Sequence, residues 1–423
     1  MRMRIALISS EFDGGLHVGG IGTYMRNVAD MMVARGHKVE VFAAAHQTAF
    51  DLRADGLRIN TVRCLIRGDY QDLVAPAFLE RHREAPFDVA EGAEFLAETR
   101  AVAEAVPELP LVLKLHTPSV LISIIEALVL PMSAKARFVL GGLRRGKIVK
   151  PYWHYDPAAD YERDNLRTAS EITAPCHAIV KKLSEIWKIS PADIEVIPNI
   201  FVAPDALLQV PVDTQTRVIT FIGRLEVRKG VQDLAEAIPL VLQKIKDARF
   251  RFVGRSSRYP GTGEDIRKML ERRLAPVTHA VEFIEGVPYD EVHRYYATSD
   301  ICVLPSIWEN FPNVCLEAMA AARGVIGSSA GGMAEMIDNG KTGLLVPPRS
   351  PKAIANAILA LLRDPKQRMQ MGRSAREHVR VNYAPDVIAP LQEASYERAI
   401  LRARQRHRFE GQWMQHPVNR VAG

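Results

Sequence analysis

The chain has 423 residues, a net charge of +6, a hydrophobic content of 48% and a charged content of 25%. At roughly 150 residues per domain, this length predicts two or three domains, each able to bury its own core. No apolar run reaches the roughly 18 residues of a membrane-spanning helix, and the cysteines show neither CxxC nor His-paired spacing. A spanning helix, a zinc site and a disulfide framework are therefore not expected, whereas the positive charge favours an anionic partner.

The opening stretch MRMRIALISSEFDGG predicts a first β-strand. Its apolar run is short and meets Glu11 without a small-residue cleavage site, so we do not expect a signal peptide. The scattered cysteines fit a reducing cytoplasm, so a cytoplasmic protein is expected. The following GGIGTY opens a helix predicted over residues 21–35, where backbone groups of Gly19 and Gly20 can face an anion. The motif lacks the GxGxxG spacing of a dinucleotide site.

Two further stretches of the N-terminal half are informative. LKLHTP places His116 at the end of a strand, a position that favours function, although a lone histidine is more often structural. Residues 119–150 combine an apolar, helix-compatible run with six basic residues, and no acid occurs between Ala127 and Tyr155. An interfacial surface for anionic lipid and a buried core helix followed by a solvated basic loop both explain this pattern.

Strand-like runs alternate with helical periods along the chain, as in KVEVFAA, RVITFIG, RFRFVG, VEFIEG and DICVLPS. This alternation predicts an α/β fold of two doubly wound, Rossmann-like domains facing a central cleft. We expect an N-terminal domain over 1–203, a linker over 204–216 and a C-terminal domain over 217–384. Residues 385–423 are predicted to form a helix that returns to the N-terminal domain.

The stretch FIGRLEVRKG begins as a strand and turns at Gly223. Arg224 and Lys229 then lie in the loop before a helix that starts near Val231. Two cations beside a helix N-terminus are suited to a diphosphate, because fixed charge and backbone N–H groups converge there. A solvated basic loop is the alternative interpretation.

The stretch SIWENFPNVCLEAMA places Glu309 in a loop and Glu317 in the first turns of a helix, with Asn313 as its expected N-cap. A loop carboxylate can accept hydrogen bonds from sugar hydroxyls, and Glu317 can take a vicinal diol such as ribose. The two acids thus indicate a nucleotide-sugar. Taken alone, Glu317 is explained as a partner of the helix dipole, and Glu309 is explained as a surface acid.

The stretch GSSAGGMAEMI predicts a third strand, small-residue turn and helix start. Its GSSAG portion also matches the nucleophile elbow of α/β-hydrolases, with Ser329 as the nucleophile. The only HGGG-like stretch lies far upstream in the other predicted domain, which weighs against a hydrolase.

Taken together, the GRL…KG loop, the Glu309/Glu317 pair and the GG-x-x-E turn resemble glycosyltransferase family 4 over nearly the whole chain. These are retaining enzymes of the GT-B fold. The resemblance implies catalytic roles for His116, Arg224, Lys229 and Glu309. It further implies donor-binding roles for a second set of residues: Gly19, Gly20, Asn199, Gly223, Arg255, Val287, Asn310, Phe311, Pro312, Asn313 and Glu317. The family's usual Asn-Gly is Asn199-Ile200 here.

The resemblance implies transfer of a hexose from a nucleotide-sugar to a hydroxyl of a glycan, glycolipid or lipid-linked acceptor in cell-envelope or exopolysaccharide synthesis. A UDP-sugar is favoured and a GDP-sugar comes next. No cofactor or metal is expected, since no Asp-x-Asp pair is present. A sugar-nucleotide epimerase of the same fold is the alternative. Nucleic acid is not an expected partner, because the basic residues are dispersed, whereas peripheral contact with an anionic inner membrane face fits residues 119–150.

Overall fold

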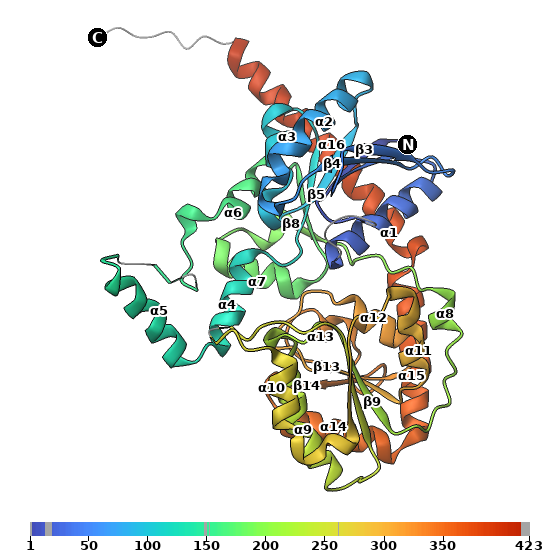
Figure 1. Cartoon of the computed structure of the whole chain (residues 1–423). Coiled ribbons are helices and arrows are strands. Elements are labelled where there is room, and N and C mark those ends of the chain that lie inside the picture. The colour runs from blue at the N-terminus through green and yellow to red at the C-terminus, as the bar shows by residue number, and fades with distance from the viewer. Residues whose placement is uncertain (1, 13–18, 148–149, 152, 261, 416–423) are drawn as a thin grey trace. The chain divides into compact units, whose positions relative to one another are not determined.

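The computed structural model describes residues 2–12, 19–147, 150–151, 153–260 and 262–415. The chain forms two compact α/β units (Figure 1). Unit 1 comprises Met1–Ser119, Pro157–Ile200 and Pro385–Gly423, and unit 2 comprises Val120–Asp156 and Phe201–Ala384. The predicted N-terminal range of 1–203 therefore differs from unit 1, because the segment 120–156 groups with unit 2.

Unit 1 is built on an eight-stranded sheet of the order β3-β4-β2-β1-β5-β6-β7-β8. Its strands are β1 (Arg4–Ile8), β2 (Lys38–Ala45), β3 (Ala49–Leu52), β4 (Arg58–Arg63), β5 (Val89–Ala93), β6 (Leu111–Lys114), β7 (Glu171–Ala174) and β8 (Ile194–Val196). Neighbouring strands run parallel except the edge strand β3, which is antiparallel to β4. The expectation that a helix follows KVEVFAA was wrong, since β2 leads directly into β3.

The helices of unit 1 are α1 (Gly20–Ala34), α2 (Tyr70–Glu84), α3 (Arg100–Ala105), α6 (Tyr161–Asn165), α7 (His177–Trp187) and α16 (Pro385–Gln415). Helix α1 ends at Ala34, one residue before the predicted end, and Gly36 follows it with a φ of 86°. The N–H of Gly36 reaches the carbonyl of Val33, and the N–H of His37 reaches the carbonyl of Met32. The buried face of α1 packs in one core with β1, β2 and α16.

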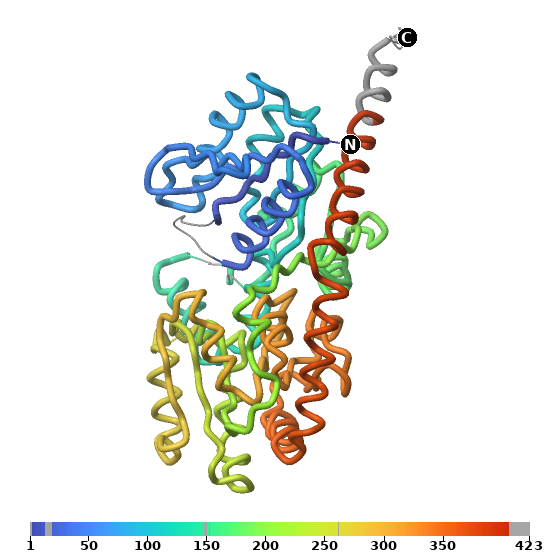
Figure 2. The backbone as a smooth tube through the Cα atoms, turned by 90° about the vertical axis from the view of Figure 1, so that its right-hand side faces the viewer, coloured from blue at the N-terminus to red at the C-terminus, as the bar shows by residue number. Residues whose placement is uncertain are grey.

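Helix α16, the last helix of the chain (Figure 2), belongs to unit 1, and buried polar contacts hold it there. The carboxylate of Glu91 in β5 is fully buried and accepts hydrogen bonds from Tyr24 (2.6 Å), Gln392 (2.8 Å) and Tyr396 (2.5 Å). Burial raises the pKa of Glu91, which the surrounding hydroxyl donors partly offset. The last long helix therefore completes the first unit, although it follows the second unit in sequence.

Unit 2 is built on a six-stranded parallel sheet of the order β11-β10-β9-β12-β13-β14. Its strands are β9 (Val218–Ile222), β10 (Arg249–Val253), β11 (Val281–Ile284), β12 (Ile301–Leu304), β13 (Gly324–Ser328) and β14 (Leu344–Val346). Its helices are α5 (Met132–Arg144), α8 (Asp205–Leu208), α9 (Val231–Leu242), α10 (Ile266–Arg273), α11 (Val292–Ala297), α12 (Asn313–Ala320), α13 (Met333–Met336), α14 (Pro351–Arg363) and α15 (Pro365–Tyr383), together with α4 (Ser119–Val129) from its second residue onward.

The predicted linker over 204–216 is an integral part of unit 2. It contains α8 and buries Leu207 and Val210. The buried guanidinium of Arg323 donates to Thr214 Oγ1 (3.1 Å) and to the carbonyl of Pro211. Low periodicity and two prolines indicated a loose connector, but arginine donors from elsewhere in the unit satisfy its carbonyl groups.

Candidate functional site

The candidate residues of unit 2 share one edge of its sheet. Strands β9, β12 and β13 are consecutive neighbours and run parallel, so their carboxyl ends lie on the same side. Each of these ends leads into one of the three predicted loops, which begin at Gly223, Pro305 and Ser329. The topology thus brings together motifs that are about 100 residues apart in the chain.

Close backbone contacts fix these loops to each other. The N–H of Ile307 donates to the carbonyl of Arg228, and the N–H of Gly332 donates to the carbonyl of Glu309, both at 2.8 Å. Gly331 has a φ of 77°, and a Cβ atom there would lie 2.0 Å from the Glu309 carbonyl oxygen. Only glycine allows this approach, so the Gly331–Gly332 turn sets the position of the Glu309 backbone.

Glu309 forms the charged centre of the site. Its side chain is 9% exposed, and its Oε1 lies 2.5 Å from Lys229 Nζ and 3.0 Å from Arg228 Nη1. Burial opposes its ionisation, but the attraction of Arg228 and Lys229 prevails and lowers the pKa of Glu309. Glu309 is therefore a carboxylate at neutral pH, held directly between two cations.

Arg228 is a site residue that the sequence analysis missed. It bridges Glu309 and Glu226, with its Nη2 2.6 Å from Glu226 Oε1, and its side chain is 17% exposed. The predicted Arg224 is instead 67% exposed and lies 3.7 Å from Glu226. RLEVRKG offered three basic candidates, and only the short helical turn over Val227–Lys229 shows that Arg228 turns inward.

The predicted segment from Asn310 to Asn313 leads into α12. Pro312 occupies the N-cap position and Asn313 is the first helical residue, so the expected Asn313 cap was wrong. Asn310 is buried, and the largely buried ring of Phe311 packs edge-on against Tyr383 at 5.5 Å. The α12 N-terminus thus begins four residues after Glu309, with no side-chain cap on its first N–H groups.

Glu317 lies inside α12 and is 5% exposed. Its Oε2 accepts a hydrogen bond from the Tyr296 hydroxyl at 3.0 Å. Burial raises the pKa of Glu317 to about 7, which this hydrogen bond only partly counteracts. Its charge therefore changes near neutral pH, unlike that of Glu309.

The remaining unit 2 candidates line the neighbouring strand ends. Gly223 has a φ of 140° and donates its N–H to the carbonyl of Val253 at 2.9 Å. The Arg255 carbonyl accepts from Leu225 at 2.8 Å, while its side chain is exposed. Val287, after β11, is half-buried. These residues lie along the same sheet edge, one and two strands from β9.

The other predicted residues belong to unit 1. His116 lies two residues beyond β6, and its ring meets Tyr24 edge-on at 5.2 Å. Burial, aided by Lys114, lowers the pKa of His116 to about 3, so its imidazole is neutral at physiological pH. Asn199 is buried, and within the described chain its Oδ1 has no hydrogen-bond partner.

Gly19 and Gly20 open α1, where a neighbouring carboxylate shapes the helix start. A Cβ atom on Gly19 would lie 2.6 Å from Glu11 Oε2, so a side chain would displace that group. The same oxygen accepts the N–H of Gly22 at 3.1 Å, and Glu11 pairs with Arg67 at 2.7 Å. The amide of Gly22, next to the predicted Gly19 and Gly20, therefore already serves a carboxylate of the chain.

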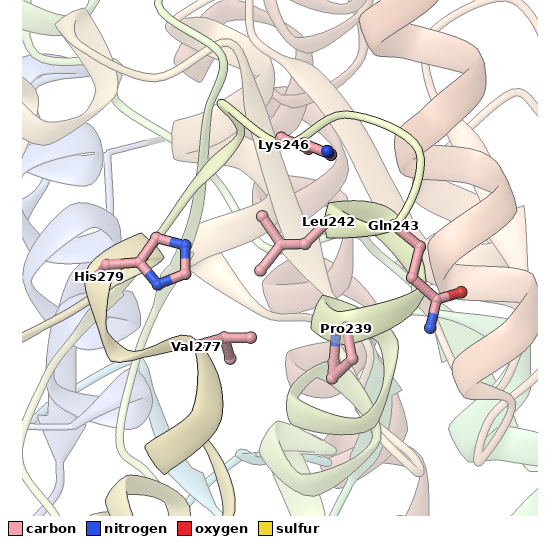
Figure 3. A pocket seen from close by; sticks show the side chains of 6 residues that line it. All are labelled: Pro239, Leu242, Gln243, Lys246, Val277 and His279. Carbon is pink, nitrogen blue, oxygen red and sulfur yellow. The ribbon is translucent and has the colours of Figure 1, made fainter.

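A cavity of the C-terminal unit lies away from these residues (Figure 3). Its volume is about 370 Å³, and it is lined by Pro239, Leu242, Gln243, Lys246, Val277 and His279. These residues lie in the last turn of α9, just after it or just before β11, so they are at the amino ends of the strands. The cavity is therefore at the sheet edge opposite the loops of Glu309.

Metal sites and membrane-spanning helices would leave recognisable features among the described residues. No group of three or more His, Cys, Asp or Glu residues there is arranged to hold a metal ion. No single described helix is long and apolar enough to cross a membrane, although the bent pair α4 and α5 passes the test of length and composition together.

Nor does the backbone at Ser329 favour a hydrolase. A nucleophile elbow holds its serine on a sharp, strained turn. Ser329 is exposed, and the described residues with positive φ do not include it. The glycine pair that follows it instead supports the Glu309 loop.

Comparisons with known proteins agree for both halves of the chain. The model described as a glycosyl transferase 4-like domain matches residues 19–200, and the model described as glycosyl transferases group 1 matches residues 216–364. A D-inositol 3-phosphate glycosyltransferase of Corynebacterium urealyticum is 27% identical over 405 residues, which are 89% of this chain and 91% of the relative. Its counterpart in Corynebacterium glutamicum is 34% identical over 174 residues, 41% of each chain.

Solved structures share the fold at low identity. Sucrose-phosphate synthase from Thermosynechococcus elongatus has a TM-score of 0.68 and 21% identity, covering 94% of this chain and 98% of that structure. The catalytic domain of starch synthase IV from Arabidopsis thaliana, bound to ADP and acarbose, has a TM-score of 0.68 and 14% identity. The match covers 95% of this chain and 100% of that structure. HepE from Anabaena in complex with UDP-glucose has a TM-score of 0.63 and 17% identity, covering 93% of this chain and 99% of that structure.

These matches favour a transferase over the epimerase and hydrolase alternatives. The two family models together cover most of both α/β units, and named glycosyltransferases align with nearly the whole chain. The chain belongs to glycosyltransferase family 4 and is a GT-B enzyme that transfers a sugar from a nucleotide-sugar.

Proposed function

We propose that this enzyme moves a hexose from a UDP-sugar, with a GDP-sugar as the next candidate, to a hydroxyl of a glycan, glycolipid or lipid-linked acceptor. The reaction retains the anomeric configuration, needs no metal and serves cell-envelope or exopolysaccharide synthesis. The enzyme acts in the cytoplasm and peripherally at the inner face of the membrane.

One observation carries this proposal. A buried carboxylate, Glu309, is held by Lys229 and Arg228 at the carboxyl edge of the sheet and four residues before the α12 N-terminus. The arrangement supplies a hydrogen-bond acceptor for sugar hydroxyls beside cations and free N–H groups for phosphates. That juxtaposition matches the two ends of a nucleotide-sugar.

The donor half of the mechanism follows from where negative charge develops. As the anomeric bond breaks, the leaving diphosphate gains charge, and Lys229, Arg228 and the exposed Arg224 provide positive charge on one loop. Preorganised donors of this kind are commonly worth about 3 kcal/mol of the barrier each. The α12 N-terminus adds partial positive charge. Electrostatic stabilisation by the chain itself thus accounts for departure of the leaving group.

The acceptor half involves a hydroxyl that attacks from the leaving-group face and loses its proton to a phosphate oxygen. We assign no covalent nucleophile, because Glu309 is already engaged by two cations. The neutral imidazole of His116 can donate or accept a hydrogen bond to the sugar or acceptor without carrying charge. Glu317 binds the ribose hydroxyls in this scheme.

The choice of UDP has support from the names of similar structures. HepE was solved with UDP, with UDP and glucose, and with UDP-glucose. Starch synthase IV was solved with ADP, so the fold accommodates more than one base. At these identities the likeness concerns the fold alone, which makes the base a matter for measurement.

The test is a transfer assay with UDP-glucose, UDP-galactose, UDP-N-acetylglucosamine and GDP-mannose, run with EDTA. Acceptors include lipid extracts, oligosaccharides and D-inositol 3-phosphate, the last taken from the name of the relatives. The proposal predicts release of UDP with a glycosylated product of unchanged anomeric configuration. Conversion of the donor sugar without any acceptor would favour the epimerase, and strict dependence on a divalent metal would contradict the mechanism.

A further inference from the structure

The segment 119–144 forms two helices with different environments (Figure 1). Helices α4 and α5 meet at a bend of 115° around Pro131. Helix α4 buries Leu121 and Ile125, one turn apart. Helix α5 buries only the small residues Ala134 and Gly142. Of the interpretation as a buried helix followed by a basic loop, the helix agrees with the buried side of α4, but the loop was wrong, because residues 132–144 are helical and largely exposed.

The exposed side of α5 is apolar. We define the α5 stripe as Met132, Ala136, Val139, Leu140 and Leu143, all of which are exposed. Their spacing of three or four residues places them on one side of the helix. Met132 is 78% exposed, Leu143 57% and Leu140 52%. An apolar stripe is normally the side that a helix turns toward a core, so its exposure here indicates a different neighbour.

Basic residues border this stripe on both sides. At 3.6 residues per turn, Lys135 falls at one border and Arg137 and Arg144 at the other. Arg145 and Lys147 follow the helix, and no acid occurs between Ala127 and Tyr155. A helix with an apolar side, flanking Lys and Arg and no acid is complementary to an anionic lipid surface.

The same segment contacts the loop of unit 2 that follows β10. The carbonyl of Val129 in α4 accepts a hydrogen bond from the Tyr259 hydroxyl at 3.2 Å. Burial raises the pKa of Glu126 in α4, and the nearby charge of Glu226 raises it further while Arg228 lowers it. Helix α4 thus joins the exposed α5 to the loop that follows β10, and it places Glu126 within electrostatic reach of Glu226 and Arg228.

We propose that the α5 stripe and its basic borders dock on an anionic membrane surface and anchor the donor-binding unit there. Apolar side chains enter the region between headgroups and acyl chains, while the basic residues contact lipid phosphates. The inference rests on the proposed peripheral action of the enzyme and identifies the residues and the lipid class. It places a membrane-embedded acceptor hydroxyl near the unit that binds the donor.

The experiment is co-sedimentation of the full chain with vesicles of phosphatidylcholine alone and of equal parts phosphatidylcholine and phosphatidylglycerol. Wild type should pellet with the anionic vesicles and less so as salt is raised, because exposed charges are screened. Leu140→Glu/Leu143→Glu should reduce the bound fraction by roughly tenfold or more, since it places two acids on the stripe. The matched control is Leu52→Glu/Leu65→Glu, which alters two leucines of unit 1 that are 62% and 59% exposed.

Several results would overturn the inference. These are absence of wild-type pelleting, equal pelleting of the two double variants, or equal binding to neutral vesicles. A lower molecular mass for the stripe variant in light scattering would assign the surface to a second copy instead. A large drop in its melting temperature would show that the stripe packs inside the protein.

Nucleotide binding separates this inference from the proposed function. Titration of UDP without vesicles should give the same affinity for wild type and the stripe variant, because the stripe lies outside the loops that carry Lys229 and Glu309. Vesicle binding without UDP binding would contradict the proposed donor and leave the docking surface standing. UDP binding without vesicle binding would support the proposed donor and overturn the docking surface.

Discussion

Single residues of the site differ in how their charge is controlled. Glu309 and Glu317 are both buried, yet Glu309 faces two cations and Glu317 faces a tyrosine hydroxyl. The pKa of the first is lowered and that of the second is raised to about 7. The two carboxyl groups therefore suit different tasks, a permanent acceptor beside phosphates and a titratable acceptor for hydroxyls.

Replacing Lys229 by Ala should lower kcat by roughly 10²- to 10³-fold, because it removes one preorganised charge from the leaving diphosphate. Acceptor KM should change little. Steady-state kinetics of UDP release measures both quantities. Lys352→Ala, an exposed lysine of α14, is the matched control. An unchanged kcat in Lys229→Ala would remove the diphosphate role.

Glu309→Ala should destabilise the fold by roughly 3 kcal/mol, because it leaves two largely buried cations without their shared partner. Urea unfolding followed by circular dichroism gives the free energy of unfolding. Glu285→Ala, whose side chain is 61% exposed and lies 3.5 Å from Arg267, serves as the control and should change stability little. Similar values for the two variants would show that the Glu309 cluster contributes nothing beyond a surface ion pair.

UDP affinity should rise as the pH passes upward through about 7. Ionised Glu317 accepts ribose hydroxyls more strongly than the protonated acid, and its folded pKa is about 7. The stability of the fold depends on pH in the opposite direction. Because the pKa of Glu317 is higher in the folded than in the unfolded chain, its contribution to stability is fully present below the unfolded pKa near 4.5. This contribution is lost as the pH rises to about 7. Titrations across this range should lose their pH dependence in Glu317→Gln. A persistent dependence would assign it to another group.

At the scale of elements, glycine turns hold the strand-end loops in contact. Gly331→Ala should disrupt the site, because the new Cβ would lie 2.0 Å from the Glu309 carbonyl oxygen. Gly340→Ala is a close control, since Gly340 has a φ of 84° and open space around its Cβ position. Both variants should lose about 1 kcal/mol from backbone strain, and Gly331→Ala should lose clearly more together with UDP binding. Equal losses in thermal and calorimetric measurements would refute the role of this contact.

Elements with strong local signals were predictable from the sequence. The strands β1, β9 and β12 are mostly apolar, β10 alternates arginine with phenylalanine, and α1 shows helical periodicity up to its Gly36 cap. Strand β5 was missed because its sequence VAEGA contains the buried Glu91, which is satisfied only by partners from α1 and α16. Arg228 was missed for the same reason, since its partner Glu309 is 81 residues away.

For the whole molecule, the return of α16 makes unit 1 discontinuous in sequence. Tyr396→Phe should lower its stability by about 1 to 2 kcal/mol, because the buried Glu91 loses a hydrogen bond of 2.5 Å. Tyr161→Phe, at a tyrosine that is 41% exposed, should change stability by less than about 0.5 kcal/mol. Denaturant unfolding compares the two. Equal values would show that α16 is not held through Glu91.

We predict that this glycosyltransferase binds its nucleotide-sugar through the Arg228–Lys229–Glu309 cluster of unit 2. Calorimetric titration with UDP in EDTA tests it most directly, with GDP and ADP alongside and with Lys229→Ala and Lys352→Ala as paired variants. The account predicts metal-independent binding of UDP that is lost in Lys229→Ala and kept in Lys352→Ala. Binding of none of the three nucleotides, or equal binding by both variants, would contradict it.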